Sequence, residues 1–352
     1  MPARETTARL DAGMAVELRQ APASVRDQQE ALAAPVAELV ARLVRRPPDL
    51  VVTCARGSSA HAATFAKHLI ERHLGIPVAA AAPNIATIYR RPLRLKDQLF
   101  LAVSQSGSSD DLVETTRMAR AAGALTAALT NDVRSPLACA SDITLPMAAG
   151  REASVAATKT FIASLSAMLR VTAAWTADAA MLLACDRLPE RLAQAAELDW
   201  RCGLPPLAET GSLVTIGRGP TLAIAREAAL KLKETCTLHA EAFSAAEFRH
   251  GPIALVSSAY PVLVFAPSDE AAAGIFQLVA DLCGKGACVL VAASRLQQKH
   301  AALALPALAP EQADADAICQ IQSFYAFLVR LAKRRGNDID SPPHLQKVTR
   351  TR

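Results

Sequence analysis

The chain has 352 residues, 51% of them hydrophobic, which is enough to bury a large core and to form two domains of ordinary size. Aromatic residues make up only 4% of the chain, and the net charge of +5 comes from scattered basic residues without interleaved aromatics. This composition argues against an all-β sandwich and against nucleic-acid binding, and it favours helices packed on parallel sheets.

The N-terminal segment, residues 1–34, is expected to form a helical arm, and it has no apolar signal-peptide core. The apolar stretch Val171–Cys185 is too short to span a membrane and is interrupted by Asp178, so we expect a core helix there. Eight cysteines without a CxxC pair indicate free thiols and a reducing, cytoplasmic compartment. Those that lie within or beside apolar runs, as buried thiols do, are Cys54, Cys236, Cys283 and Cys288.

Four short apolar runs in the first half of the chain recur, in order, in the second half. The matching pairs are Val52–Gly57 with Val214–Gly219, Leu99–Val103 with Pro261–Phe265, Ala127–Thr130 with Val289–Ala292, and Ile143–Pro146 with Leu303–Pro306. Helical patterns such as Asp111–Ala122 and Glu270–Leu282 separate these runs. Strand–helix alternation that occurs twice predicts two tandem, doubly wound α/β domains, each a flavodoxin-like three-layer αβα unit with a parallel sheet.

This repeat sets the expected domain boundaries. The first domain is expected at residues 35–175 and the second at residues 200–335. Between them, residues 176–199 are expected to form a helical linker that breaks at Pro189. The polar tail, residues 336–352, has no periodicity and by composition is a frayed end.

A hydroxyl-rich loop follows the predicted strand Leu99–Val103. The loop Ser104–Ser109 offers four serines, Gln105 and a glycine, and a helix is expected from Asp110. In doubly wound sheets ligands bind at such strand ends, and a helix N-terminus favours a phosphate. The loop lacks the lysine of a P-loop, which argues against a nucleotide triphosphate, and an ordinary N-capped turn remains the alternative. A second hydroxyl-bearing turn, Gly57–Ser59, follows another strand of the same half, which favours the phosphate site.

The two halves differ at equivalent positions. The repeat aligns Ser104–Ser109 with Ala266–Ala271, which has lost most hydroxyls and gained acidic residues. Conversely, the predicted helix Ile224–Leu238 carries Glu227, Lys231 and Glu234 on one face, where the first half has Phe65, Leu69 and Arg72. That charged face is either a surface ion pair or the place of a general base.

His250 lies just before a Gly-Pro turn, where we expect its side chain to be exposed. Solvation at the surface is its ordinary explanation. His239 and His250 lack the spacing of a zinc site with nearby ligands, so no metal is expected.

Together these segments resemble the SIS (sugar isomerase) domain pair, as found in the isomerase half of glutamine–fructose-6-phosphate aminotransferases and in isomerase-like glucosamine-6-phosphate deaminases. The resemblance is colinear from about Met14 to the C-terminus. The segments that carry it are Ser104–Ser109, Ser154–Lys159, Glu227–Glu234, His239–Glu241, Arg249–Pro252 and the tail Leu345–Thr349.

The resemblance implies a role for each matching residue. Ser104, Gln105, Ser106 and Ser109 would hold the phosphate, with Ser58 and Ser59 beside them, and Val155 and Ala157 would line the sugar through backbone groups. Glu234 would move a proton between C2 and C1, supported by Glu227 and Lys231. His250 would help to open the sugar ring, from the partner subunit of a homodimer with shared active sites. Lys347 would close over the substrate.

The implied activity is that of an enzyme without metal or cofactor, the isomerising deamination of an amino-sugar phosphate such as glucosamine 6-phosphate. Arg56, Ser108 and Ala157 depart from the aminotransferase pattern, which puts the detailed sugar contacts in doubt. The sequence begins Met-Pro-Ala-Arg-Glu, without the glutaminase domain of the aminotransferases, so we expect release of ammonia rather than its incorporation. Galactosamine 6-phosphate or fructosamine 6-phosphate as substrate, a sugar-phosphate sensor, and a synthase with a separate glutaminase chain remain open.

Overall fold

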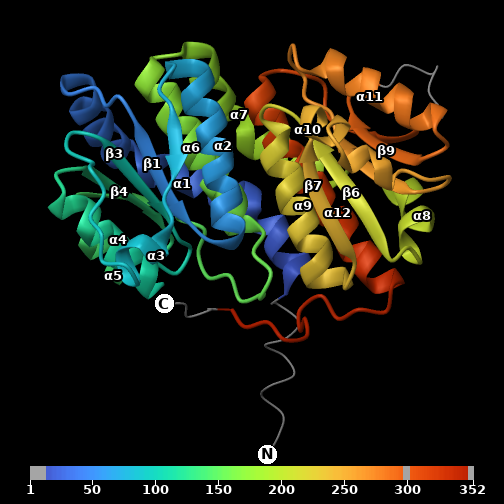
Figure 1. Ribbon diagram of the computed structural model, residues 1–352, viewed down its shortest axis with the longest axis horizontal. Helices are drawn as coiled ribbons and strands as arrows, with labels where there is room; N and C mark the ends of the chain where they lie inside the picture. The colour runs from blue at the N-terminus through green and yellow to red at the C-terminus, as the bar shows by residue number, and fades with distance from the viewer. Residues whose placement is uncertain (1–12, 296–301, 348–352) are drawn as a thin grey trace, which may run out of the picture. The chain divides into compact units, whose positions relative to one another are not determined.

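The computed structural model describes residues 13–295 and 302–347 (Figure 1). The chain divides into two compact units, each with one parallel sheet. The unit that contains the first sheet, here called the first-sheet unit, comprises Ala23–Glu152, Lys159–Arg187 and Gln346–Arg352. The second-sheet unit comprises Met1–Pro22, Ala153–Thr158 and Leu188–Leu345. The expected boundary after residue 34 falls inside one helix, α1, which runs over Met14–Arg45.

The first-sheet unit is built on five parallel strands in the order β2-β1-β3-β4-β5. The strands are β1 (Val51–Ala55), β2 (Val78–Ala80), β3 (Leu99–Val103), β4 (Leu125–Thr130) and β5 (Ile143–Pro146). Every residue of β3 is buried, as expected for a central strand covered on both faces. Its helices are α2 (Gly57–Leu74), α3 (Pro83–Thr87), α4 (Asp110–Ala121), α5 (Pro136–Ala140), α6 (Lys159–Thr176) and most of α1. Figure 1 shows the sheet between α2 and α6 on one face and α4 and α5 on the other.

The second-sheet unit repeats this design, with a five-stranded parallel sheet in the order β10-β9-β8-β6-β7. Counted from its own first strand, β6, this is the same order as in the first sheet. The strands are β6 (Ser212–Gly217), β7 (His239–Ser244), β8 (Pro261–Phe265), β9 (Cys288–Ala293) and β10 (Leu303–Pro306). The helices are α8 (Leu204–Ala208), α9 (Thr221–Cys236), α10 (Ala245–Arg249), α11 (Ala272–Gly284) and α12 (Ala313–Arg334), with short 3-10 turns at Arg201–Gly203 and Pro252–Leu255.

The prediction of two doubly wound α/β domains with parallel sheets is therefore confirmed. All four pairs of apolar runs that define the sequence repeat form strands at matching places in the two sheets. In each sheet the chain crosses from the second strand to the other side of the first, which creates a switch point where ligands of this fold bind. In the first sheet this point lies at the carboxyl ends of β1 and β3.

The prediction of one core helix over Val171–Cys185 is wrong, because two helices meet there. Helix α6 ends at Thr176, and Ala177 takes a left-handed conformation with φ 54°. Helix α7 then spans Ala179–Ala196, and the Asp178 carboxylate accepts a hydrogen bond of 2.9 Å from Met181 N. Asp178, interpreted as an interruption of a helix, caps the start of the next one.

The predicted break at Pro189 is also wrong, since Pro189 lies inside α7. A proline in a helix leaves the carbonyl four residues earlier without its usual donor. Here that carbonyl belongs to Cys185, and it accepts a hydrogen bond of 2.9 Å from the Gln29 side chain of α1. A side-chain donor thus replaces the missing backbone donor and the helix continues.

The burial of the cysteines agrees only in part with the prediction from the sequence. All eight cysteines are free; Cys54 and Cys236 are buried, whereas Cys283 and Cys288 are only half-buried because they lie at the end of α11 and at the start of β9.

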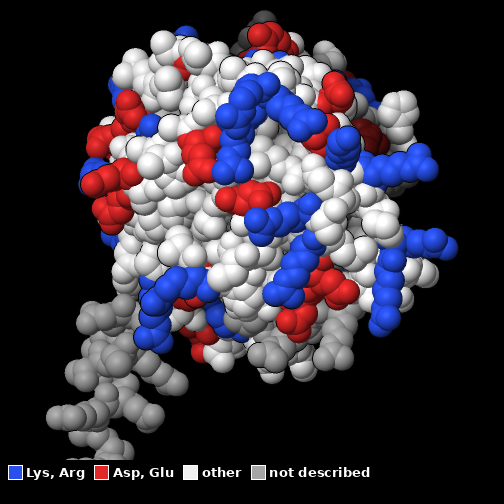
Figure 2. All heavy atoms as spheres, turned by 90° about the vertical axis from the view of Figure 1, so that its left-hand side faces the viewer, with Lys and Arg blue, Asp and Glu red and all other residues white. Residues whose placement is uncertain are grey.

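No helix within residues 13–295 and 302–347 is both long and apolar enough to cross a membrane. Figure 2 shows that basic and acidic side chains are interspersed on the face it presents.

Candidate functional site

The hydroxyl-rich loop lies at the switch point of the first sheet, between the end of β3 and the start of α4. Its side chains order its own backbone: Ser104 Oγ accepts from Gly107 N at 3.2 Å, and Ser106 Oγ accepts from Ser108 N at 3.3 Å. Ser109 is the N-cap residue of α4, yet its side chain makes no hydrogen bond to the helix. The hydroxyl of Ser109 and the helix N-terminus are thus suited to an anion.

Gly107 fixes the shape of this loop. Its φ of +61° lies in the left-handed region, and a Cβ at this position would come within 2.1 Å of Ser135 Oγ. Its carbonyl accepts a hydrogen bond from Leu137 N at 3.0 Å, and the Gln105 carbonyl accepts one from Asn131 N at 3.1 Å. Only glycine permits this close packing of the loop against the segment that follows β4.

Two further hydroxyls lie at the same edge of the sheet. Ser58 and Ser59 are in the first turn of α2, directly after β1, and both are half-buried. Because β1 and β3 are parallel neighbours, their carboxyl ends meet at one edge, as the sequence analysis required. The first-sheet unit therefore brings the predicted phosphate ligands of both loops to the switch point of its sheet.

An ion pair at this edge was missed by the sequence analysis. The Arg56 guanidinium donates from Nε and Nη2 to Asp111 Oδ2, at 3.1 and 3.0 Å. Asp111 is buried in the first turn of α4, whereas the Arg56 side chain is 55% exposed. Arg56 thus neutralises an acidic group at the helix N-terminus and adds a partly exposed cation beside the loop. Only the shared sheet edge brings the two together, since 55 residues separate them.

The segment that carries Val155 and Ala157 belongs to the second-sheet unit. Both residues are half-buried, and Ala156 between them is buried. At the start of this segment Ala153 N donates to Glu17 Oε1, and Ser154 N donates to Glu17 Oε2 at 3.2 Å. Glu17, on the first turn of α1 and itself buried, therefore holds the backbone whose polar groups the resemblance assigns to the sugar.

The predicted charged face of α9 forms a buried triad. Lys231 Nζ lies 3.4 Å from Glu227 Oε1 and 2.5 Å from Glu234 Oε2. The side chains of Glu227 and Lys231 are 0% and 1% exposed, and that of Glu234 is 21% exposed. The explanation as a surface ion pair is therefore wrong. Two buried groups support one carboxylate that remains partly accessible.

The electrostatics of the triad keep Lys231 charged. Burial alone would lower the pKa of its ammonium group, but the charges of Glu227 and Glu234 outweigh burial and raise that pKa above its ordinary value. Tyr325 of α12, also buried, lies with its hydroxyl 3.2 Å from Glu227 Oε1. The sequence analysis missed Tyr325, which lies 98 residues further along the chain in another helix, α12.

His250 lies at the C-terminal end of α10 and is exposed, as expected. It lines an open pocket of about 410 Å³ in the second-sheet unit, together with Arg218, Arg249 and Glu270. Arg249 is bound to Asp281 at 2.8 Å, which partly neutralises its charge. His250 therefore belongs to a polar surface of its own unit at the carboxyl end of β6.

Lys347, on the tail expected to be frayed by composition, makes an ion pair. Its Nζ lies 3.1 Å from Glu152 Oε2, and the Glu152 side chain is fully buried. The same carboxylate accepts a hydrogen bond of 2.6 Å from Thr160 Oγ1 and one of 3.2 Å from Thr160 N. Glu152 and Thr160, which precede and follow the segment with Val155 and Ala157, are thus hydrogen-bonded to each other. Lys347 binds the same Glu152 carboxylate. Sequence reasoning did not single out Glu152.

No group of three or more metal-ligating side chains is found within the described ranges 13–295 and 302–347. The site residues are hydroxyls, backbone amides, carboxylates and ammonium groups, which suit a phosphorylated polyol and proton transfer.

Comparison with known proteins identifies the family. The model of the SIS domain matches residues 47–173 and 206–310, one stretch for each sheet. The chain belongs to the SIS domain family. Among solved structures, a proposed phosphosugar isomerase from Silicibacter pomeroyi is 43% identical, with a TM-score of 0.88 over 93% of this chain and 99% of that one.

Curated relatives point to the same family. The glutamine–fructose-6-phosphate aminotransferase of Symbiobacterium thermophilum is 33% identical over 322 residues, which cover 84% of this chain and 51% of the relative. That of Halobacterium salinarum is 34% identical over 316 residues. The chain thus spans about half the length of these relatives. The glucosamine-6-phosphate deaminase of Thermotoga maritima, at 22% identity and a TM-score of 0.71, shares the fold.

Proposed function

We propose that this SIS protein catalyses the isomerising deamination of an amino-sugar phosphate, with glucosamine 6-phosphate as the first candidate. Glucosamine 6-phosphate and water would give fructose 6-phosphate and ammonia. The proposal assigns phosphate binding to the first-sheet unit and proton transfer to the second-sheet unit. It rests on one observation above all: a buried ammonium group, Lys231, holds a carboxylate that is still accessible, Glu234.

The geometry of the triad suits a base that must stay in one position. Lys231 binds Oε2 of Glu234, and Lys231 is itself fixed by the buried Glu227 and, through it, by Tyr325. A positioned base contributes a factor of about 10²–10⁴ to the rate of a proton transfer. A lone surface carboxylate would not be fixed in this way.

The loop Ser104–Ser109 supports the phosphate end of the proposal. It joins serine hydroxyls, a helix N-terminus and the nearby Arg56 at a sheet switch point. Anchoring the phosphate would fix the reacting carbons relative to the base, which is the way remote binding energy contributes to catalysis. The curated relatives named above are aminotransferases of fructose 6-phosphate, which also favours a phosphorylated amino sugar.

The reaction would proceed in three steps. Ring opening, assisted by His250, exposes an aldehyde at C1 and so acidifies the proton on C2. Glu234 removes that proton, which gives an enolamine, and returns it to C1, which leaves an imine at C2. Water adds to the imine carbon and ammonia leaves, so that the ketose phosphate is formed. Lys347 would close over the open-chain intermediate, as lids do when they exclude water.

His250 is proposed to act in a homodimer, on the substrate of the partner subunit. A chain with His250→Ala mixed with a chain with Glu234→Gln should then regain part of the activity, since one site of the mixed dimer keeps both groups. If the subunits exchange and activity stays absent, His250 acts within its own chain or takes no part.

The deciding experiment measures ammonia release from glucosamine 6-phosphate, galactosamine 6-phosphate and fructosamine 6-phosphate, with glutamine plus fructose 6-phosphate as the reverse test. We expect release from an amino-sugar phosphate and loss of it in Glu234→Gln. The control is Glu209→Gln, which changes an exposed carboxylate next to α8 and should keep full turnover.

Other outcomes would change the assignment. Release of ammonia only from fructosamine 6-phosphate would make the protein a deglycase. Release only from galactosamine 6-phosphate would make it a galactosamine-6-phosphate deaminase. Tight binding of a sugar phosphate without any turnover would identify a sensor. Glutamine-dependent synthesis by the chain alone would contradict the proposed direction.

A further inference from the structure

A second pocket opens at the carboxyl edge of the second sheet, apart from the residues assigned above. It has a volume of about 210 Å³ and lies where the loop after β8, the end of β9 and helix α12 meet. Ala266 and Asp269 come from the loop, Ser294 and Arg295 follow β9, and Gln320 belongs to α12. The whole lining belongs to the second-sheet unit.

The repeat shows how the corresponding loops of the two halves differ at this place. The two loops begin alike, since Ser104 N donates to Leu129 O and Ala266 N donates to Ala292 O, both at 3.0 Å. In the first half Gly107 then packs closely against Ser135. In the second half Asp269 stands at the position equivalent to Gly107 and lines the pocket.

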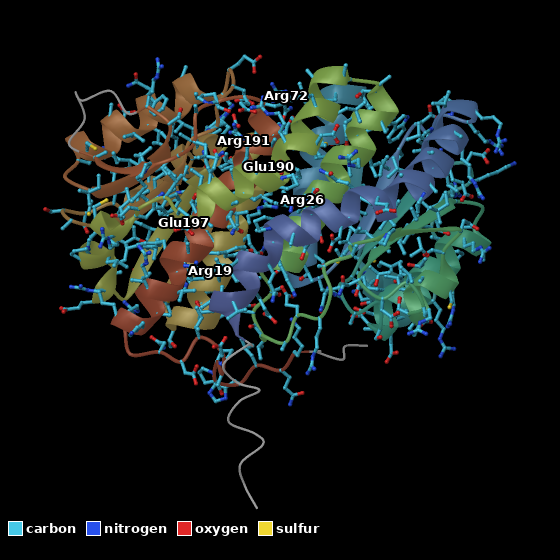
Figure 3. All side chains as sticks on the ribbon, turned by 180° about the vertical axis from the view of Figure 1, so that it is seen from behind. Arg19, Arg26, Arg72, Glu190, Arg191 and Glu197 are labelled. Carbon is cyan, nitrogen blue, oxygen red and sulfur yellow. The ribbon has the colours of Figure 1, made fainter. Side chains whose placement is uncertain are left out.

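The floor of the pocket is a built polar network rather than a packing defect. Arg191 of α7, labelled in Figure 3, donates to Asp316 Oδ1 at 2.7 Å and lies 2.8 Å from Glu311 Oε1. Ser268, the one serine that the loop keeps, donates to Asp316 Oδ2 at 2.6 Å. The side chains of Arg191 and Asp316 are 7% and 9% exposed. Because each charge is paired, the network stays rigid without a ligand.

Two lining residues, Arg191 and Gln320, each keep one buried polar atom without a hydrogen-bond partner in the part of the chain that the structure describes; for Arg191 this atom is Nε. Gln320 Nε2 donates to Ala266 O at 2.7 Å, but Gln320 Oε1 finds no donor among residues 13–295 and 302–347. Gln320 is only 5% exposed. An unsatisfied buried acceptor costs about 1–3 kcal/mol, and this oxygen is itself shielded from solvent. The hydroxyl groups of a ligand would instead meet the accessible Ser268 and Asp269 of the lining.

The charges of the lining select against a phosphate. Arg191 and Arg295 balance Asp269 and Asp316, so the lining carries no net formal charge. The loop has replaced the hydroxyls of its counterpart with acidic groups, which repel phosphate and accept hydrogen bonds from hydroxyls. The apolar wall, which includes Phe276 and Leu308, offers a surface for the apolar face of a ring.

We propose that this pocket binds a neutral polyhydroxylated ligand, namely a single unphosphorylated sugar ring. Its volume is below the range of about 300–1,000 Å³ typical of sites for drug-sized ligands, which limits the ligand to about one ring. Burial raises the pKa of the neighbouring Cys319 thiol to about 12, so the thiol stays protonated and the site is one of binding rather than covalent chemistry. This ligand is a second one, independent of the substrate of the proposed deamination.

The test is calorimetric titration of the full chain with glucose and with N-acetylglucosamine. We expect one of them to bind with a dissociation constant of about 1 mM or tighter. Ala272, at the first position of α11, lines the pocket, and Ala272→Phe should fill it and weaken binding at least tenfold. The matched control is Ala273→Phe, one residue further on and exposed, which should change binding by less than about twofold.

Circular dichroism establishes that each variant is folded, and Ser294→Leu at the exposed rim serves as a second blocking variant. Equal binding by the wild type and both blocking variants would overturn the proposal, as would the absence of binding heat for both sugars. The titration needs no turnover, so it stands apart from the ammonia assay: failure of one leaves the other intact.

Discussion

The two sheets share one strand order but differ in the chemistry at equivalent positions. Helix α2 presents the buried Phe65 and Leu69 where α9 presents the buried Glu227 and Lys231. The loop after β3 keeps four serines, whereas the loop after β8 keeps one. A duplicated scaffold can thus specialise by exchanging a few side chains at strand ends and on one helix, while the apolar strands that hold the two cores stay alike.

The cost of this specialisation differs between the halves. Apolar side chains on α2 stabilise through burial alone. The charged face of α9 requires that each buried charge find a partner, because an unpaired one is strongly destabilising. Substitutions in both halves, a pH dependence and thiol labelling test this comparison.

The largest expected effect comes from Lys231→Met. The variant removes the ammonium that pairs with the fully buried Glu227, and loss of one partner of a buried pair costs about 3–5 kcal/mol. Urea unfolding followed by circular dichroism measures this. The control is Lys233→Met on the same helix, where the side chain is exposed and the change should stay within about 0.5 kcal/mol. Equal stability of the two variants would contradict the description of the triad.

The same triad has a pH signature. Because the folded-state pKa of Lys231 lies above its unfolded value of about 10.4, the stabilisation it provides is complete below pH ~10.4 and is lost as pH rises through the folded pKa. The free energy of unfolding of the wild type should therefore fall in that alkaline range by an amount missing in Lys231→Met.

The next effect is on turnover. Lys347→Met removes the ammonium that binds the buried Glu152 and that is proposed to close over the substrate. We expect kcat for ammonia release to fall by roughly 10²-fold, the loss that a small misplacement of the reacting groups causes. Lys333→Met, an exposed lysine near the end of α12, is the control and should leave kcat unchanged. Normal turnover in Lys347→Met would remove the tail from the mechanism.

A smaller effect is expected on stability when Gly107, in the loop after β3, is substituted. Gly107→Ala would strain a positive φ and force Cβ against Ser135, so we expect a loss of about 2–4 kcal/mol. Gly150→Ala is a matched control, since Gly150 has φ +64° but nothing within 4 Å of the added Cβ. It should cost only about 1–2 kcal/mol. Thermal unfolding compares the two variants, and equal losses would show that close packing of the loop Ser104–Ser109 is unimportant.

The smallest effect is on thiol reactivity. Burial raises the pKa of Cys54, Cys185 and Cys319 to about 12, so these thiols should resist iodoacetamide at pH 8 in the folded protein. Cys139 and Cys202 are exposed and should react first. Peptide mass spectrometry after brief labelling measures this, and early labelling of Cys54 would contradict the packing of the first core.

The strands could be predicted from the sequence because their signal is local. β3, β5, β8 and β10 match the predicted runs residue for residue, since a short apolar run bounded by turns is enough to indicate a strand. Strand β7 was not predicted, because His239 and Glu241 lie on its exposed side at the edge of the sheet and break the apolar run. The break predicted at Pro189 was wrong because the helix is maintained by a distant residue. Gln29, which donates to the Cys185 carbonyl, lies 156 residues away from it in the sequence.

The site shows the same limit. The i, i+4 and i+7 spacing of Glu227, Lys231 and Glu234 predicted their shared face, but not that the face is buried. Burial depends on Tyr325 and α12, whose placement no local pattern gives. Likewise Glu152 meets Lys347 across 195 residues. Contacts of this range come from the tertiary fold.

The most direct test of the central claim is proton exchange at C2 of the amino-sugar phosphate in deuterated water, followed by NMR for the wild type and Glu234→Gln. The amide keeps the size of the side chain but cannot take up the proton. The account predicts exchange in the wild type and its loss in Glu234→Gln, with binding of the sugar phosphate retained. Exchange at the wild-type rate in Glu234→Gln would contradict it and place the base elsewhere.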